Sequence, residues 1–313
     1  MMIAMRSAIP ALGLLVAVLG GCLPTGTSAT LAPTLTMVET GGLQVAMQNG
    51  HPVPSYEWQP RPRLELDGPW RVERIELDQR LTMSARDTSL EGIDTTHIRR
   101  TDSEPTGVAI IAVGPRGENQ IVVAPGANAI LALDDADRAL IGSADCVLTN
   151  HEIPAAVTVE VLRTAHAAGV TAILNPAPAR ALSSEILSLG PILTPNEHEL
   201  VVAIGNDITG AALDELAARH RGPIVVTQGP AGALLADGDR RERFEGRLAP
   251  EVVDTTGAGD AFCGVLATWL AEGCELGEAI TAANAAGALS VAAAGARQGM
   301  PTREALEAFL RAT

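Results

Sequence analysis

The chain has 313 residues and a formal net charge of −15; 47% of its residues are apolar and only 2% are aromatic. This length allows one large domain or two smaller ones, with a core built mainly from Ala, Val, Leu and Ile. The negative charge disfavours nucleic acid and anionic membrane surfaces as partners and suits a soluble metabolic enzyme. The four cysteines form no C-x-x-C pair, which excludes the usual zinc and redox motifs. Cys146 and Cys263 lie in apolar surroundings and are predicted as core residues.

Residues 1–22 have the pattern of an export signal. Arg6 is positively charged, residues 8–19 are apolar, and Leu19-Gly20-Gly21-Cys22 resembles a bacterial lipoprotein cleavage box. The apolar stretch is too short to span a bilayer as a mature helix. A buried N-terminal strand or helix is the alternative. Attachment to a membrane is therefore expected only if Cys22 is lipidated.

Residues 23–88 differ in character from the rest of the chain. They begin with a tether rich in Pro, Thr, Ser and Gly (Pro24–Pro33), and Leu64–Trp70 followed by Val72–Leu77 predicts a turn and a strand. This part is expected to be partly disordered or β-structured. It carries no catalytic constellation of its own.

Strand and helix patterns alternate from residue 89 onward. Two strands joined by Gly114–Gly117 predict a hairpin, and the segments after them predict a parallel sheet covered on both faces. The expected strands are 106–113, 120–123, 146–149, 170–174, 192–194 and 224–227, and the expected helices are 155–168, 182–189, 199–204, 211–220, 257–272, 276–294 and 303–312.

Polar residues follow several of these strands. In open parallel sheets, ligands gather beyond the carboxyl ends of the strands, so these residues are expected to converge on one site. They are Asn150–Glu152, Asn175, Asn196–Glu199 and Thr227–Gly229.

The stretch Asp254-Thr255-Thr256-Gly257-Ala258-Gly259-Asp260 precedes an apolar run with helical spacing. Its glycines permit a sharp turn, so main-chain amides are expected at a helix N-terminus, where they bind anions. Asp260 then lies in the first turn, where a carboxylate stays ionised near neutral pH. An anion cradle beside a carboxylate is what phosphoryl transfer to a hydroxyl requires. An ordinary Gly-rich turn with a first-turn acid is the alternative.

This stretch resembles the second signature of the PfkB family of sugar kinases, the ribokinase family. Further phrases resemble the family in its own order across residues 89–313: Pro105–Ala109, Pro125–Asn128, Asn175–Ala179, Leu193–Glu197, Gly295–Ala296 and Pro301–Glu304. The resemblance implies a ribokinase-like three-layer α/β/α fold, ATP as donor, Mg²⁺, a monovalent cation such as K⁺, and phosphorylation of the 5-hydroxyl of D-ribose.

The resemblance also implies roles for individual residues. Asp260 would be the catalytic base, Gly257, Ala258 and Gly259 its anion hole, and Glu152 a contact to the sugar. The nucleotide would be bound by Asn196, Thr227, Gln228, Gly229, Pro230, Ala231, Gly232, Gly259 and Asn284. Glu199 would place Mg²⁺, and Asp254, Thr256, Ser290, Ala293, Gly295 and Gly299 would form the monovalent-cation loop.

Each role has a structural alternative. Asn196 and Glu199 also form a good helix-capping pattern, and both roles can hold together. Residues 227–232 could be a plain connecting turn, Asn284 a helix-contact residue, Glu152 an exposed loop acid, and the cation-loop residues a Gly-rich helix exit. His151 and His198 have no second ligand at a recognisable spacing and are expected to be solvated loop residues.

The N-terminal part departs from the family. The family's first strand with its sugar-binding aspartate, its Gly-Gly-Lys-Gly-like helix start and its N-terminal lid strands have no counterpart in residues 1–88. The sequence therefore predicts a chimera with a seam near Ala85–Glu91, a sheet with exposed apolar edges, and weak or no ribose phosphorylation. A homodimer formed through lid strands is not expected.

Two other functions stay open. One is a PfkB-type kinase for another sugar or a nucleoside. The other is a non-catalytic exported lipoprotein with a vestigial kinase domain. A working kinase would be cytoplasmic, because ATP is scarce outside that compartment, whereas residues 1–22 favour export.

Overall fold

The computed structural model describes residues 2–5, 75–76, 94, 97–105, 107–113, 119–204, 212–293 and 295–312. Contacts within the chain divide it into two compact units. One comprises Met1–Gly20, Ser84–Arg99 and Asn128–Thr313, and the other comprises Gly21–Met83 and Arg100–Ala127. The predicted cleavage box, the tether and the seam lie outside the described residues.

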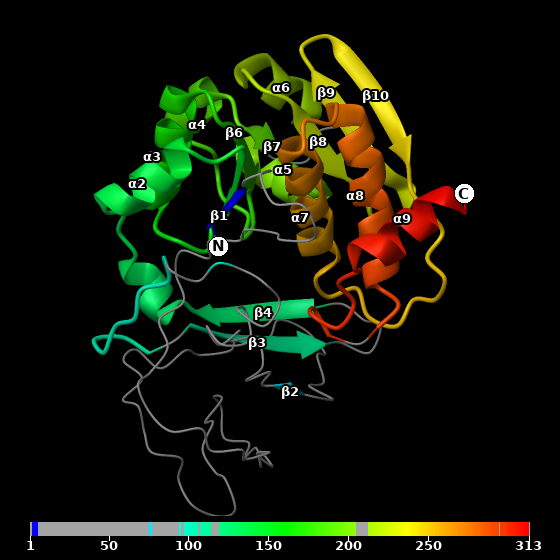
Figure 1. Cartoon of the computed structure of the whole chain (residues 1–313), viewed down its shortest axis with the longest axis horizontal. Coiled ribbons are helices and arrows are strands. Elements are labelled where there is room, and N and C mark those ends of the chain that lie inside the picture. The colour runs from blue at the N-terminus through cyan, green and yellow to red at the C-terminus, as the bar shows by residue number, and fades with distance from the viewer. Residues whose placement is uncertain are drawn as a thin grey trace, which may run out of the picture. The chain divides into compact units, whose positions relative to one another are not determined.

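The larger unit is built on a seven-stranded sheet with the order β1-β5-β6-β7-β8-β9-β10 (Figure 1). Strands β5 to β8 are parallel, whereas β9 and β10 are antiparallel additions at one edge and β1 is antiparallel to β5 at the other. The strands are β1 (Met2–Met5), β5 (Cys146–Asn150), β6 (Thr171–Asn175), β7 (Ile192–Leu193), β8 (Ile224–Thr227), β9 (Gly232–Asp237) and β10 (Arg240–Glu245).

Helices cover both faces of this sheet, as the alternating pattern predicts (Figure 1). Helices α2 to α6 pack on one face, and α7 and α8 pack on the other, with α9 against α8. They are α2 (Asp135–Gly142), α3 (Ala155–Ala168), α4 (Ser184–Leu189), α5 (Glu197–Ile204), α6 (Ala212–Arg219), α7 (Ala258–Ala271), α8 (Leu276–Ser290) and α9 (Arg303–Arg311). None of these described helices has the length and apolar character of a membrane span.

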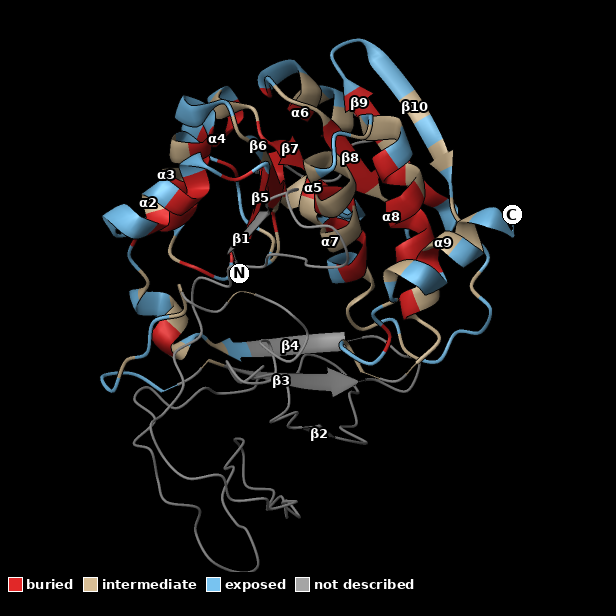
Figure 2. Cartoon of the chain, viewed as in Figure 1, coloured by how far each residue is buried: buried red, intermediate tan, exposed pale blue. Residues whose placement is uncertain are grey.

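Successive residues of the central strands enter different cores because side chains alternate across a strand. On β6, Ile173 faces α7 and α8, whereas Leu174 faces the helices of the opposite layer. Both are fully buried, and the buried side chains line the faces of the helices that point to the sheet (Figure 2). A strand buried on both faces reads as an unbroken apolar run, which is why these strands were predictable.

Several expectations need correction. The helix expected over 276–294 ends at Ser290, and α2, β9 and β10 had not been predicted. An open apolar edge had been expected beside the parallel strands, but β1 pairs with β5 from Met2↔Thr149 to Met5↔Cys146 and covers that edge. These four residues form a strand, which was the alternative considered for the N-terminal segment.

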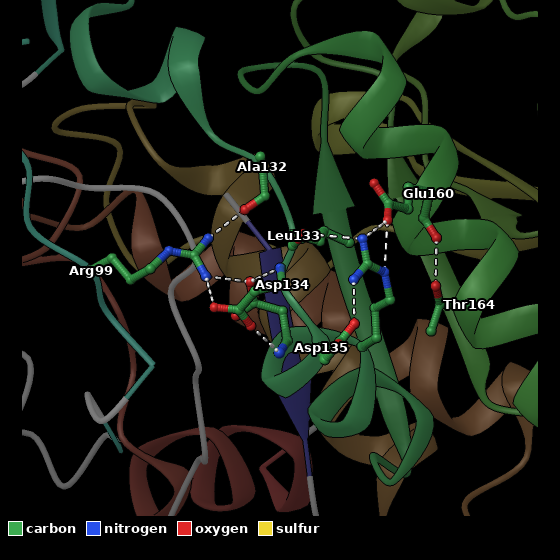
Figure 3. A network of polar contacts seen from close by, with 9 residues as sticks. Arg99, Ala132, Leu133, Asp134, Asp135, Glu160 and Thr164 are labelled. Carbon is green, nitrogen blue, oxygen red and sulfur yellow. Dashed lines mark hydrogen bonds and ion pairs between the residues drawn. The ribbon is translucent and has the colours of Figure 1, made fainter.

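Helix α2 begins with a capping box that the segment ahead of it reinforces (Figure 3). The Asp137 amide donates to the Asp134 carboxylate, and the Asp134 amide donates back to Asp137, each at 2.9 Å. The Arg99 guanidinium reaches both carboxylates, at 2.8 and 2.5 Å, and also the carbonyl of Ala132. Asp137 is buried, so this pairing satisfies a charge that would otherwise be costly to bury.

The smaller unit holds a three-stranded antiparallel sheet. Strands β3 (Val108–Val113) and β4 (Asn119–Ala124) pair as the expected hairpin, and β2 (Ile75–Glu76) adds to β3. Of the strand predicted over Val72–Leu77, the structure describes only Ile75 and Glu76, and these two residues do form a strand. β3 and β4 come from the part of the chain that resembles the kinases, and β2 comes from the part that does not.

Candidate active site

The predicted anion site lies at the N-terminus of α7. Gly257 adopts the left-handed conformation with φ of +83°, and the helix begins at Ala258 without a side-chain cap. The Ala258 amide turns back to the Thr255 carbonyl, whereas the amides of Gly259 and Asp260 belong to the first turn, which offers them no intrahelical acceptor. The turn therefore leaves main-chain donors available for an anion, as the sequence predicts.

Asp260 occupies the first turn of α7, and its side chain keeps access to solvent. The surrounding protein nevertheless desolvates the carboxyl, and this desolvation together with the negative charge of Glu152 raises its pKa. The sequence had suggested only the stabilising effect of the helix N-terminus. A raised pKa suits a general base, because proton transfer is most efficient when that pKa approaches the working pH.

Glu152 follows β5 in the loop before α3. Its carboxylate is exposed, and its amide donates to Asn150 Oδ1 at 3.1 Å, which shapes the loop. Helix α7 packs against β5. The negative charge of Glu152, in the loop after β5, contributes to the raised pKa of Asp260 in the first turn of α7.

Asn196 and Glu199 form the capping arrangement at the start of α5. The Asn196 amide and side-chain nitrogen each donate to Glu199 at 2.9 Å, and the Glu199 amide donates to Asn196 Oδ1 at 2.8 Å. Burial raises the pKa of the Glu199 carboxyl, and the Asn196 amide opposes part of that effect. The capping role is therefore present, and it holds the carboxylate at the carboxyl edge of the sheet.

The predicted nucleotide loop continues from β8. Thr227 pairs with Asn196 in an isolated parallel bridge, and its amide donates to the Pro195 carbonyl at 2.9 Å. The loop then turns through a 3₁₀ helix (Gly229–Ala231) in which Pro230 and Ala231 are exposed. Gly232 has no room for a Cβ atom, which would lie 2.1 Å from the Phe244 carbonyl oxygen.

The side chain of Gln228 connects this loop to its neighbours. Its nitrogen donates to Glu197 at 3.3 Å, and its oxygen accepts from Arg243 at 3.0 Å. The loop is thus tied to the first turn of α5, directly after Asn196, and to β10. Hydrogen bonds therefore connect the nucleotide loop to the Asn196–Glu199 motif, although the two were predicted separately.

Asn284 is the predicted site residue whose contacts favour the structural alternative. It is buried on α8, and its side-chain nitrogen donates to the carbonyls of Phe244 at 3.1 Å and Glu245 at 3.3 Å. These bonds tie α8 to the end of β10. Asn284 therefore acts in this structure as a helix–strand contact.

The predicted cation loop is drawn together by Asp254. One of its carboxylate oxygens accepts from the Thr256 amide and hydroxyl, and the other accepts from the Gly295 amide at 2.8 Å. Burial acts to raise the pKa of Asp254, but these bonds outweigh it and hold the pKa below its ordinary value. The segments on either side of α7 and α8 are thereby fixed to each other.

The other cation-loop residues lie where α8 ends. The Val291 carbonyl accepts from the amides of Val253 and Asp254, which continues the contact between the two segments. A Cβ atom on Gly299 would lie 1.9 Å from the Ser290 carbonyl oxygen, so the chain passes close to itself there. Ala293 is half-buried in the turn that follows α8.

The prediction for the histidines is half right. His198 is exposed, but His151 is buried, and its Nδ1 lies 3.3 Å from the Pro178 carbonyl. Burial lowers the pKa of His151, which keeps its ring neutral. Across the described ranges, no group of three or more His, Cys, Asp and Glu side chains has the arrangement of a metal site.

Comparison with known proteins identifies the family to which the chain belongs. The model of the pfkB family of carbohydrate kinases matches residues 82–303. The chain belongs to the PfkB family. It is an ATP-using carbohydrate kinase, which transfers a phosphoryl group to an alcohol.

The relatives of this PfkB kinase include several ribokinases. The ribokinase of Haemophilus influenzae is 37% identical over 227 residues, which cover 70% of this chain and 74% of that protein. The crystal structure of a ribokinase from Thermotoga maritima matches with a TM-score of 0.66 at 33% identity, covering 75% of this chain and 78% of that one. The Arabidopsis thaliana ribokinase complexed with ribose and ATP matches with a TM-score of 0.65 at 30% identity, covering 71% and 74%.

Gly257 should be intolerant of a side chain in this PfkB kinase. Gly257→Ala would force an alanine into the left-handed conformation and place its Cβ atom 2.9 Å from the Ala296 carbonyl oxygen. We expect a loss of about 1–3 kcal/mol in the free energy of unfolding, measured by chemical denaturation, together with weaker nucleotide binding.

Gly264→Ala is the matched control for that variant. Gly264 lies in the same helix with open space around it, so alanine there should stabilise the protein by about 0.5–1 kcal/mol. Equal denaturation midpoints for the two variants would contradict this account of Gly257.

Sequence reasoning about this PfkB kinase did not find one polar cluster beneath the site. Thr194, at the end of β7, is buried and lies 3.3 Å from the Cys263 sulfur. Asn175, at the end of β6, donates to the Thr194 carbonyl at 2.9 Å. The position of Asn175 and Thr194 at strand ends could have indicated that they lie close together. Their link to α7, through Thr194 and Cys263, could not be predicted, because these two residues are far apart in the sequence.

Proposed function

We propose that this kinase phosphorylates the 5-hydroxyl of D-ribose with ATP as donor, and that it does so in the cytoplasm, where ATP is available. The observation that carries the proposal is the position of Asp260 in the first turn of α7, where the main-chain amides of Gly259 and Asp260 have no intrahelical acceptor. The identity of 37% to a ribokinase supports ribose over other sugars.

The roles of the residues follow from their positions. Asp260 accepts the proton of the attacking hydroxyl, and the amides of the first turn of α7 stabilise the charge that develops on the transferred phosphoryl group. Glu152 holds a sugar hydroxyl beside Asp260. The loop Thr227–Gly232 and Asn196 bind the nucleotide at the neighbouring strand ends.

The residues present fit the cations that such a reaction uses. Mg²⁺ prefers carboxylates and water, and Glu199 offers one partly buried carboxylate at the edge where the phosphates would lie. The segment before α7 and the segment after α8, which hydrogen bonds of Asp254 and Val291 join, offer main-chain carbonyls, which suit a monovalent cation. Mg²⁺ would supply charge neutralisation of the phosphates when bound with ATP.

Glu199→Gln separates the capping role of this residue from a metal role. Glutamine has one acceptor oxygen, so it can keep the bond from the Asn196 main-chain amide but loses the bond from Asn196 Nδ2, and it removes the negative charge. We therefore expect an unfolding midpoint close to that of the unmodified protein and about a 10–100-fold increase in the Mg²⁺ concentration needed for half-maximal activity. An unchanged Mg²⁺ requirement would leave Glu199 with the capping role alone.

The substrate assignment is tested by phosphoryl transfer to a panel of acceptors. Purified protein with MgATP is offered D-ribose, other pentoses, hexoses and nucleosides, and the phosphorylated products are quantified by ³¹P NMR. We expect the highest kcat/KM with D-ribose and a 5-phosphate product. A preference for a nucleoside or another sugar would overturn the assignment of substrate but not of the phosphotransferase class.

A further inference from the structure

We propose that Cys263 is a positioning residue: held by Thr194, it fixes the first turn of α7 against the carboxyl end of the sheet and so keeps Asp260 in place. This inference rests on the proposed function, in which Asp260 is the base. It concerns a buried cysteine that the anion site, the nucleotide loop and the cation loop do not use.

The contacts form a short polar chain beneath the site. Asn175 Nδ2 donates to the Thr194 carbonyl at 2.9 Å and lies 3.5 Å from the Thr194 hydroxyl. That hydroxyl lies 3.3 Å from the Cys263 sulfur. The Thr194 amide donates to the Leu174 carbonyl at 3.1 Å, so Thr194 is fixed to β6 through its main chain. The polar chain thus connects two strand ends to α7.

Cys263 lies one helical turn after Asp260. Residues three apart lie on the same face of a helix. The contact of Cys263 with Thr194 therefore limits movement of the helical turn that carries Asp260. The negative charges of Asp260 and Glu199 add to the effect of burial on the pKa of the Cys263 thiol. Burial is the main cause of that shift to about 12, so the thiol stays neutral and is able to donate a hydrogen bond.

The local structure makes such a restraint useful. The helix begins at a glycine turn without a side-chain cap, so the hydrogen bonds of a capping residue do not hold its first turn. Thr194 is 1% exposed and Cys263 is 4% exposed, so water does not replace their contact. Without Cys263 the buried Thr194 hydroxyl would keep only its long 3.5 Å contact with Asn175, which favours keeping the helix in this position.

Cys146 provides a matched control. It is also a buried cysteine, it belongs to the same core cluster as Cys263, and burial likewise raises its pKa to about 12. It lies at the start of β5, at the opposite end of the strand from Asn150 and the site. Truncating either cysteine to alanine therefore removes the same atoms from the same core, but only one truncation removes the contact with Thr194.

The experiment compares Cys263→Ala, Cys263→Ser, Thr194→Val and Cys146→Ala with the unmodified full chain. Hydrogen exchange of peptides covering residues 255–264 reports on the first turn of α7 without requiring turnover. The kcat for phosphoryl transfer reports on Asp260, and the melting temperature reports on the general effect of core truncation.

We expect Cys263→Ala and Thr194→Val to raise exchange in residues 255–264 and to lower kcat by about 10-fold, with KM for ATP changed far less. Serine can bond Thr194, so Cys263→Ser should keep kcat within about 3-fold of the unmodified protein. Cys146→Ala should lower the melting temperature similarly but leave kcat and the exchange of this segment unchanged. The double variant Thr194→Val/Cys263→Ala should be no worse than either single variant, as coupled residues require.

Equal effects of Cys263→Ala and Cys146→Ala on exchange and kcat would overturn the inference, because Cys263 would then only fill volume. If the unmodified protein transfers phosphate to none of the acceptors, the proposed function fails. In that case the exchange measurement still decides whether Cys263 fixes the start of α7.

Discussion

Replacement of Asp260 by asparagine is expected to lower the rate of phosphoryl transfer by about 10²–10⁴-fold, the usual contribution of a positioned general base. Asparagine has nearly the same shape but cannot accept the proton of the attacking hydroxyl. Because the main-chain amides and the nucleotide loop remain, the dissociation constant for MgADP should change little. Transfer of radiolabelled phosphate from ATP and calorimetric titration of MgADP measure the two quantities.

Asp135→Asn is a suitable control for this variant. Asp135 is also an acid in the first turn of a helix, but it is exposed at the start of α2 and pairs with Arg138. If Asp260 were an ordinary first-turn acid, both substitutions would have small and similar effects. A transfer rate for Asp260→Asn within a few-fold of the Asp135→Asn rate would contradict the role of Asp260 as base.

The pH dependence of this activity should carry the signature of the Asp260 environment. The base acts when it is ionised, and desolvation and the charge of Glu152 raise its pKa. As the pH is lowered, kcat/KM should therefore begin to fall at a higher pH than it would with an ordinary aspartate as the base. Glu152→Gln removes one cause and should move the acidic limb of the pH profile to lower pH. An unmoved limb in Glu152→Gln would show that Glu152 does not influence the base.

Ribose phosphorylation by the chain as it stands is expected to be weak, with kcat/KM at least about 10²-fold below that of a complete ribokinase. The match to the Haemophilus influenzae enzyme covers 74% of that protein, and the family match begins only at residue 82. The family match leaves out residues 1–81, where the part that is expected to bind the sugar hydroxyls would lie. Positioning supplies much of an enzyme's acceleration, so its loss should be severe.

A coupled assay with saturating MgATP and D-ribose measures this directly. A chimera that replaces residues 1–81 by the N-terminal part of a ribokinase should recover most of the missing rate, whereas Asp260→Asn in that chimera should abolish the recovery. Turnover by the natural chain at the level of a complete ribokinase would contradict the prediction. Failure of the chimera to recover would locate the defect outside the N-terminal part.

The periodic elements of the fold were predictable because their patterns are local. The predicted helix over residues 155–168 has the bounds of α3, and the start of α7 follows from its glycine turn. Strand β10 was missed because it is an exposed edge strand whose residues, apart from Phe244, are all Arg or Glu and so resemble a polar loop. Helix α2 was missed although Asp134 and Asp137 form a capping pattern that the sequence displays.

Features that depend on contacts between distant segments could not be predicted. The Ala-rich sequence favours a helix through residue 294, but α8 ends at Ser290, where the Val291 carbonyl turns to accept the amides of Val253 and Asp254. The burial of His151 and the contact of Asn284 with β10 likewise depend on segments far away along the chain. The positions of Glu152 after β5 and of Glu199 and Asp260 in the first turns of α5 and α7 were, by contrast, predictable, because each depends on a local pattern.

The pairing of β1 with β5 has a consequence for maturation. A signal peptidase that cut ahead of Cys22 would remove Met2–Met5 and leave the β5 main chain without its neighbour along that edge. An unpaired edge strand readily recruits other chains. A molecule that is cleaved and lipid-anchored at Cys22 therefore cannot have the complete seven-stranded sheet, and a molecule that has this sheet has not been cleaved there.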